Sequence, residues 1–224
     1  MTTGDIYLII ETRKKKGMRG AFSPHLNQGV SAPHFLMKTE QVMSVIRECV
    51  EKRTFCELGL YYEFTRRHVL PVVAADDRFL AVQESDYRFD GFIIIDYRHV
   101  DIAVELPEKY SEIARLEGLF DGIRIPPVDI SGYRSVFAYL ANSGTNIEVE
   151  ICSDFDRETA IFAGRAVGAS EYEFRFLRFF TNCVWDKRPF NVGYDRLRAV
   201  KFGSRYLEIY SKYLPNCPAP PVRN

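Results

Sequence analysis

The chain has 224 residues and a mass of 25.9 kDa, enough for one large domain or two of about 100 residues each. Its composition, 46% hydrophobic and 27% charged, excludes a disordered, collagen-like or coiled-coil protein. Thirty Lys and Arg residues balance thirty Asp and Glu residues, which excludes a uniformly basic nucleic-acid coat and an acidic solvating chain. No apolar run approaches the ~20 residues of a membrane helix, and the first apolar stretch precedes the positive charges, the reverse of a secretory signal. We therefore expect a cytoplasmic protein without membrane contact.

Residues 1–38 predict an N-terminal strand, DIYLIIET, followed by a basic loop. The loop carries Lys14, Lys15 and Lys16 beside a glycine. This cluster has two interpretations, a flexible phosphate-binding loop or a solvated loop without a partner.

The next segment, residues 39–52, predicts a helix because apolar residues recur at helical spacing and Thr39 is placed to cap its start. Alternating or apolar runs after it predict strands in CELGLYYEF, VLPVVAAD, RFLAVQES, FIIIDY and VDIAVEL, with the polar turn DYRFDG before the fourth. A helical turn over 111–119 and the pair Pro126-Pro127 then mark a linker over 116–130.

The second half repeats this order. Tyr133, Val136, Phe137 and Leu140 lie 91 residues after the apolar positions of the first helix, and Gly144 is the predicted stop signal. The following strands are IEVEICSD, TAIFAGRAVGA, YEFRFLRFF, FNVGY and LRAVKFG, with later landmarks 96 residues apart and Glu148 and Glu150 facing away from the core.

These elements predict a mainly β protein with α-helices (α+β), made of two repeats of a short helix followed by a five-stranded antiparallel barrel. The domain boundaries we predict are an N-terminal strand and basic loop, a first repeat, a linker, a second repeat and a Pro-rich extended tail, at 1–38, 39–115, 116–130, 131–210 and 211–224.

Two segments carry a resemblance to a known family. The phrase from Ile151 through FAGRAV to FRFL resembles the first Sm motif, in which a glycine bends strand 2, and FNVGYDRLRAVKFG resembles the second. The resemblance implies a tandem Sm-like or SH3-like small barrel protein. Of the RNA-binding residues that Sm proteins carry, Asp76, Asp77 and His99 make a partial match, and no Arg-Gly step is present.

Charge is distributed unevenly among these segments. Residues 1–38, 39–115, 116–130 and 131–224 carry net charges of +4, −5, −2 and +3. An acidic first repeat therefore lies between basic segments, which favours self-association or a charged partner.

The second repeat carries basic side chains at strand spacing beside aromatic ones. Such an arrangement can stack bases and bind phosphates, but it also fits a solvated face over an aromatic core. The candidate nucleic-acid or partner-binding residues are Arg175, Arg178, Trp185, Lys187, Arg188 and Arg198, together with Lys14, Lys15 and Lys16.

Candidates for chemistry are few. Asp154 and Asp156 fit either a cation site or turn-forming aspartates, and Cys183 is the one thiol placed in an exposed turn. His68 and His99 have no acid partner in the sequence pattern and are expected at the surface.

The five cysteines, at 49, 56, 152, 183 and 217, have the odd number and irregular spacing of a reducing compartment. Zinc-ligand spacings and glycine-rich phosphate loops are missing from the sequence. We expect no metal, no cofactor and no catalytic residues.

We therefore expect a noncatalytic adaptor, regulator or immunity-type protein that binds a protein partner or itself through its small barrels. The alternative is binding of RNA or single-stranded nucleic acid through the second repeat. An enzyme that uses Asp154, Asp156 or Cys183 is the third class.

Overall fold

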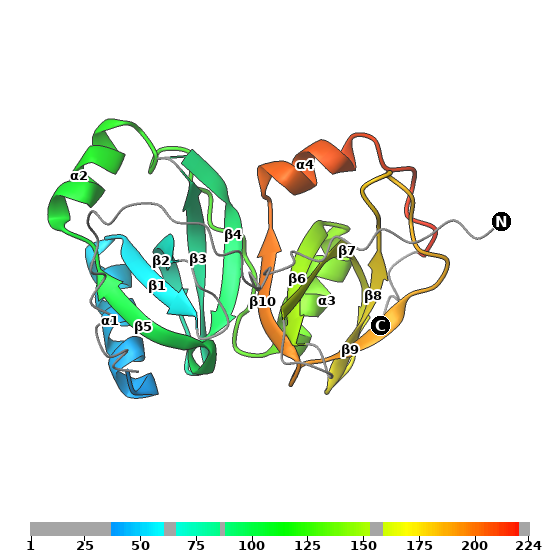
Figure 1. The fold of residues 1–224 in the computed structure, drawn as a ribbon, viewed down its shortest axis with the longest axis horizontal. Coiled ribbons are helices and arrows are strands. Elements are labelled where there is room, and N and C mark those ends of the chain that lie inside the picture. Colours follow the sequence, from blue (N-terminus) through cyan, green and yellow to red (C-terminus); the bar gives the residue numbers. More distant parts are fainter. Residues whose placement is uncertain (1–36, 61–65, 86–87, 153–158, 220–224) are drawn as a thin grey trace, which may run out of the picture. The chain divides into compact units, whose positions relative to one another are not determined.

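The computed structural model describes residues 37–60, 66–85, 88–152, 159–219. The predicted N-terminal strand, with Lys14, Lys15 and Lys16, lies outside these ranges. Residues 36–224 form one compact unit in which helices accompany a mostly antiparallel sheet of order β5-β1-β2-β3-β4-β10-β6-β7-β8-β9 (Figure 1).

Helix α1, Thr39–Lys52, has the predicted bounds and packs its buried face against β2 and β5. Its N-cap is Lys38 instead of Thr39, and the Gln41 side chain accepts the Lys38 backbone N–H at 2.9 Å. The helix ends at Arg53, whose left-handed backbone (φ 54°) lets its N–H reach the last carbonyls. The apolar spacing thus located the helix, whereas a side chain other than the predicted one caps it.

The first five strands pair in the order β5-β1-β2-β3-β4. They lie where the alternating runs predicted them, and a short 3-10 helix precedes the last strand. Their bounds are β1 Cys56–Leu60, β2 Arg66–Ala74, β3 Arg78–Ser85, β4 Arg88–Asp96, η1 Tyr97–His99 and β5 Val100–Glu105.

The middle of the chain contains two helices. Helix α2, Glu108–Leu116, begins three residues before the predicted helical turn. Helix α3, Tyr133–Ser143, buries the predicted face and ends at Gly144 (φ 65°), a conformation that favours glycine. Phe137 of α3 stacks on Phe174 with ring centroids 3.6 Å apart, which anchors the helix to the second half of the sheet.

The last five strands pair in the order β10-β6-β7-β8-β9, the same order as in the first half. One difference is the register: Leu58 opposes Ala103, whereas Val149, its counterpart at an offset of 91, opposes Val200. The bounds are β6 Asn146–Cys152, β7 Thr159–Ala169, β8 Glu173–Arg178, β9 Phe190–Gly193 and β10 Leu197–Phe202.

Strand β10 also pairs with β4, from Ala199 opposite Ile95 to Phe202 opposite Phe92. This pairing joins the two halves into a single open ten-stranded sheet, in place of the two separate closed barrels that we predicted (Figure 1). Each of these strands is an edge of its own half and offers unpaired backbone groups, so mutual pairing satisfies both edges without closure of either half.

The centre of the sheet is buried on both faces. Ile93 and Ile95 of β4 lie in a cluster with the inner face of α1, whereas Ile94 lies in the cluster that contains the α3 residues. The continuous apolar run FIII at residues 92–95 reflects this double burial, because a strand with one solvated face would alternate.

The C-terminal region contains an element that the sequence did not predict, helix α4 (Arg205–Ser211). The segment after it was expected to be an extended tail. Instead Leu214, Cys217 and Ala219 pack against the cluster that contains Trp185. No helix in the described ranges is long and apolar enough to cross a membrane.

Candidate functional site

The predicted basic residues of the second half lie in several different surroundings. Arg175 is exposed on β8. Arg178, at the end of β8, is half-buried: its Nη2 lies 3.0 Å from a carboxylate oxygen of Asp186, and its guanidinium lies over the rings of Phe180 (4.4 Å) and Phe162 (5.5 Å). Arg178 therefore already has an acid and two aromatic partners.

Trp185 lies inside the fold. Its side chain is 8% exposed, its ring meets Phe179 edge to face, and its Nε1–H donates to the carbonyl of Pro215 at 2.8 Å. A ring buried in this way has little face on which a base could stack. Trp185 instead holds the C-terminal segment against the sheet.

The remaining predicted binding residues do not lie together in one site. Lys187 and Arg188 are exposed between β8 and β9, whereas Arg198 lies on β10 with its Nη1 3.0 Å from Nδ1 of His99. Cys183 is half-buried in a turn with φ 59°. Asp154 and Asp156, like Lys14, Lys15 and Lys16, lie outside the described residues.

The predicted surface position was wrong for His99, and the predicted lack of an acid partner was wrong for His68. His99 is only 3% exposed, and its Nε2 lies 3.0 Å from the carbonyl oxygen of Leu197. Burial, together with the charge of Arg98, lowers its pKa. His68 is partly exposed, but its ring nitrogens lie 3.6 Å from Glu57 and 3.8 Å from Glu84, so it does have acid partners. The pairing of β1, β2 and β3 brings these groups together, and sequence spacing could not show it.

The second half exposes an apolar surface that involves α4, which we call the α4 patch. Tyr206 and Tyr210 lie with ring centroids 4.5 Å apart, and Tyr210 stacks on Phe179, which ties the helix to the end of β8. The exposed apolar members of the patch are Phe180, Val184, Tyr206, Ile209 and Tyr213. The segment between β8 and β9 also carries the exposed basic residues Lys187 and Arg188, and α4 with the residue after it carries Arg205 and Lys212.

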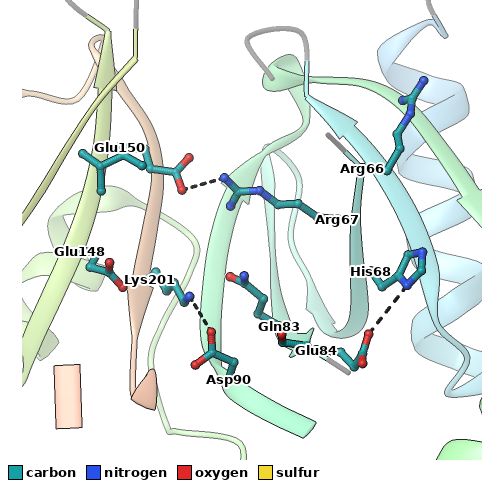
Figure 2. Close-up of a pocket in the computed structure, with 11 residues that line it drawn as sticks. Arg66, Arg67, His68, Gln83, Glu84, Asp90, Glu148, Glu150 and Lys201 are labelled. Carbon is teal, nitrogen blue, oxygen red and sulfur yellow. Dashed lines mark hydrogen bonds and ion pairs between the residues drawn. The ribbon is translucent and has the colours of Figure 1, made fainter. Parts of the chain in front are cut away.

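A second candidate site is a cavity of about 520 Å³ over β2, β3, β4, β10, β6 and β7 (Figure 2). Its lining comes from both halves and is almost entirely polar. The lining residues are Arg66, Arg67, His68, Gln83, Glu84, Ser85, Asp90, Glu148, Glu150, Ile161 and Lys201.

Two ion pairs in this lining join the halves of the chain. Arg67 of β2 donates to Glu150 of β6 at 2.8 Å, and Lys201 of β10 donates to Asp90 of β4 at 2.9 Å (Figure 2). Glu150 is only 5% exposed. A carboxylate buried to this extent needs a cation beside it, and Arg67 supplies that cation.

Glu148 lies directly opposite Lys201 in the β6–β10 ladder. Burial raises its pKa, and this effect outweighs the charge of Lys201 and the hydrogen bond that Ser204 Oγ donates at 3.2 Å. Glu148 therefore retains a proton to higher pH than an exposed glutamate does.

The sequence pattern identified part of this cavity. The alternation of β6 correctly placed Glu148 and Glu150 opposite the apolar core residues Ile147, Val149 and Ile151. The sequence pattern did not show that side chains of the first half pack on the Glu148 and Glu150 face of β6. Alternation indicates which residues share a face, but not what packs on that face.

Asp90 and Asp186, which lie 96 residues apart in the two halves, have different partners. Asp90 lies in β4 and accepts hydrogen bonds from Lys201 and from the backbone N–H of Arg205, which fixes the start of α4. Asp186 accepts from Arg178 and from the backbone N–H of Lys187. In the described part of the chain, no group of three or more His, Cys, Asp or Glu side chains is arranged to hold a metal ion.

Comparison with known proteins shows no family for this chain. No family model and no curated protein matches the sequence. Two solved structures of MrkH from K. pneumonia match weakly. The structure of its apo state is 12% identical, with 79% of this chain and 90% of MrkH covered and a TM-score of 0.15. The 2.65 Å P2(1) crystal structure is 11% identical, with 85% and 93% covered and a TM-score of 0.16. Similarity at this level supports no conclusion about fold or function.

Proposed function

We propose that the protein is a noncatalytic protein-binding module, an adaptor, regulator or immunity-type protein, and that its partner docks on the α4 patch. The observation that carries the proposal is the exposure of large apolar side chains on one short helix and the neighbouring turn, with Tyr213 71% exposed. Contiguous apolar surface rimmed by polar residues marks interaction sites on proteins.

The composition of the patch fits a protein partner. Tyrosine side chains supply large contact area at low entropic cost, and tyrosine and arginine are over-represented among residues that dominate binding energy. The exposed basic neighbours, among them Lys187, Arg188 and Lys212, favour a partner segment that carries acidic residues beside apolar ones.

Pull-down from the native host, read by mass spectrometry, tests this proposal. The variant I209S/Y213A removes exposed apolar side chains from α4 and from the turn after it, and leaves Leu207, the buried residue of the helix, in place. Loss of one truncated anchor residue costs ~2 kcal/mol, so we expect at least about a tenfold loss of a retained protein. The matched control is Tyr172→Ala, an equally exposed tyrosine at the β7–β8 turn. Equal retention by both variants would contradict docking on α4.

A second candidate function is binding of RNA or single-stranded nucleic acid through β8 and the segment that follows. It is favoured by the exposed ring of Phe180 beneath the Arg178 guanidinium, with Lys187 and Arg188 nearby in the chain. Binding of this kind weakens steeply with salt because phosphate contacts release counterions.

Gel shifts with random single-stranded RNA at low and moderate salt test the second function. We expect a complex at low salt that the variant R175A/R178A abolishes. Lys109→Ala, which changes an exposed lysine of α2, is the control variant. Absence of any complex at low salt would exclude this function.

We further propose that the two halves are copies of one Sm-like or SH3-like unit. The common strand order and the matching helices α1 and α3 support duplication. Gly164 lies in β7, the strand that corresponds to the bent strand of the first Sm motif, and a Cβ there would overlap the Leu177 carbonyl oxygen. An experimental structure tests this proposal: residues 39–105 should superpose on 133–202 with every strand in sequence order.

A further inference from the structure

The polar cavity between the two halves has no role in the docking proposed above. It lies over β2, β3, β4, β10, β6 and β7, and none of its lining residues belongs to the α4 patch. Its walls carry three Arg or Lys side chains and four carboxylates. A site with this lining can select a ligand by its charge, its polarity and its hydrogen-bonding groups.

Each Arg or Lys side chain of the lining already lies beside a carboxylate. Arg67 contacts Glu150 at 2.8 Å, and Lys201 contacts Asp90 at 2.9 Å. Arg66 lies 3.9 Å from Asp101 on the neighbouring strand β5. An anionic ligand would lose its hydration and meet no uncompensated positive charge, so this lining disfavours anions. The other two carboxylates already accept hydrogen bonds, Glu84 from the Tyr110 hydroxyl at 2.8 Å and Glu148 from the Ser204 hydroxyl at 3.2 Å. Burial also raises the pKa of Glu148, which reduces the negative charge that a cation would meet.

An apolar ligand fits the cavity no better. Ile161 is the only aliphatic side chain among the described lining residues, and no aromatic ring lines the cavity there apart from the His68 imidazole. Pockets for apolar ligands are lined mainly by aliphatic and aromatic side chains, which exclude water.

The lining does offer both hydrogen-bond donors and acceptors at close range. Gln83 has an amide oxygen that is buried and has no hydrogen-bond partner among the described residues. Ser85 and the carboxyl group of Glu148 line the same space. A hydroxyl group donates and accepts at once, so it can satisfy Gln83 and add to the existing ion pairs without breaking them.

We propose that this cavity binds a neutral, hydroxyl-rich small molecule of the size of a mono- or disaccharide. Its volume of about 520 Å³ lies within the range of small-molecule sites. Such a ligand would contact both halves of the chain, because Gln83 and Asp90 belong to the first half and Glu148 and Lys201 to the second.

Saturation-transfer NMR on the full chain tests the proposal. The probes are neutral mono- and disaccharides and inositol, each compared with charged analogues: a sugar phosphate, an amino sugar and a sugar acid. We expect at least one neutral probe to bind with a Kd of about 1 mM or lower and its charged analogues to bind at least about tenfold more weakly. No neutral binder at about 10 mM, or tighter binding by a charged analogue, would overturn the proposal.

Two variants locate the binding site. Gln83→Leu removes the unpartnered amide, and Ile161→Trp fills the cavity from a half-exposed position, so that at least one of them should leave folding intact. We expect about a tenfold weaker Kd in each folded variant, because an unsatisfied or blocked hydrogen bond costs ~1.4 kcal/mol or more. Asn142→Leu, which changes an exposed amide on α3, is the matched control. Unchanged binding in a folded cavity variant would show that the ligand binds elsewhere.

Discussion

At the scale of single residues, several ionisable groups near the place where β10 meets β4 and β6 are wholly or partly buried. Glutamate is usually exposed, and Glu148, Glu150 and His99 each have a partner from another element: Ser204 at the start of α4, Arg67 of β2 and Leu197 of β10. Burial moves the pKa of Glu148 up and that of His99 down, in each case towards the neutral form. The junction between the halves is therefore sensitive to pH.

His99 should make the protein less stable in acid. Its pKa lies below the usual 6.5, so its contribution to the free energy of unfolding is complete above pH 6.5 and is lost as the pH falls through the lowered pKa. Protonation would also place a positive ring against Arg98 and Arg198, which the charge of Asp96 offsets in part.

Urea unfolding at pH 7.0 and pH 5.0 measures this effect. We expect the wild type to lose more stability between the two pH values than the variant His99→Gln does, because glutamine has no proton to gain. The control is His68→Gln, which changes the partly exposed histidine. An equal loss in wild type and His99→Gln would refute the role of His99.

At the scale of elements, α4 and the segment after it show how a short helix is held by tertiary contacts. Its seven residues are too few to be stable alone. Ser204 caps it by accepting the Leu207 N–H at 3.3 Å, and Asp90 accepts the Arg205 N–H. The helix therefore depends on β4 and on the cluster around Trp185.

Truncation after residue 211 should expose Trp185, which is the only tryptophan of the chain. The deletion removes the Pro215 carbonyl that accepts the indole N–H, together with the apolar contacts of Leu214 and Cys217. We expect a red shift of tryptophan fluorescence and a loss of stability of about 2 kcal/mol.

The matched control for this truncation removes residues 220–224 alone, which lie outside the described ranges. This shorter deletion should leave the emission maximum unchanged. If the longer deletion also left the emission unchanged, the packing of residues 212–219 against Trp185 would be refuted.

At the scale of the whole molecule, the buried pair of Arg67 and Glu150 links β2 to β6, strands from different halves. The variant Arg67→Met leaves the Glu150 carboxylate buried without this partner and should cost ~3–5 kcal/mol. The double variant R67M/E150M replaces both charges with apolar groups and should recover most of that loss.

A double-mutant cycle by urea unfolding, with Glu150→Met as the second single variant, measures the coupling. As a comparison, the exposed pair of Lys109 and Glu112 on α2 should show a coupling below ~0.5 kcal/mol. Additive losses in the Arg67 and Glu150 variants would mean that the pair does not join the halves energetically.

The sequence by itself determined the local structure of much of this protein. The spacing of Val42, Ile46 and Cys49 predicted α1, although Lys38 and not Thr39 is its N-cap, and the alternation of β6 assigned Ile147 and Glu148 to opposite faces. These features repeat within a few residues, and the repeat at an offset of about 91 residues exposed the recurrence of one helix and five strands.

Only the tertiary structure decided what those elements pack against. The pairing of β4 with β10, the burial of Glu150 and His99, and the docking of α4 each depend on groups far apart in the chain. Edge strands have unpaired backbone groups whatever their sequence, and a charged side chain is stable when buried only if a distant partner meets it. Periodicity carries neither kind of information, so the sequence predicted the elements, while the single open sheet and its polar cavity emerged from the fold.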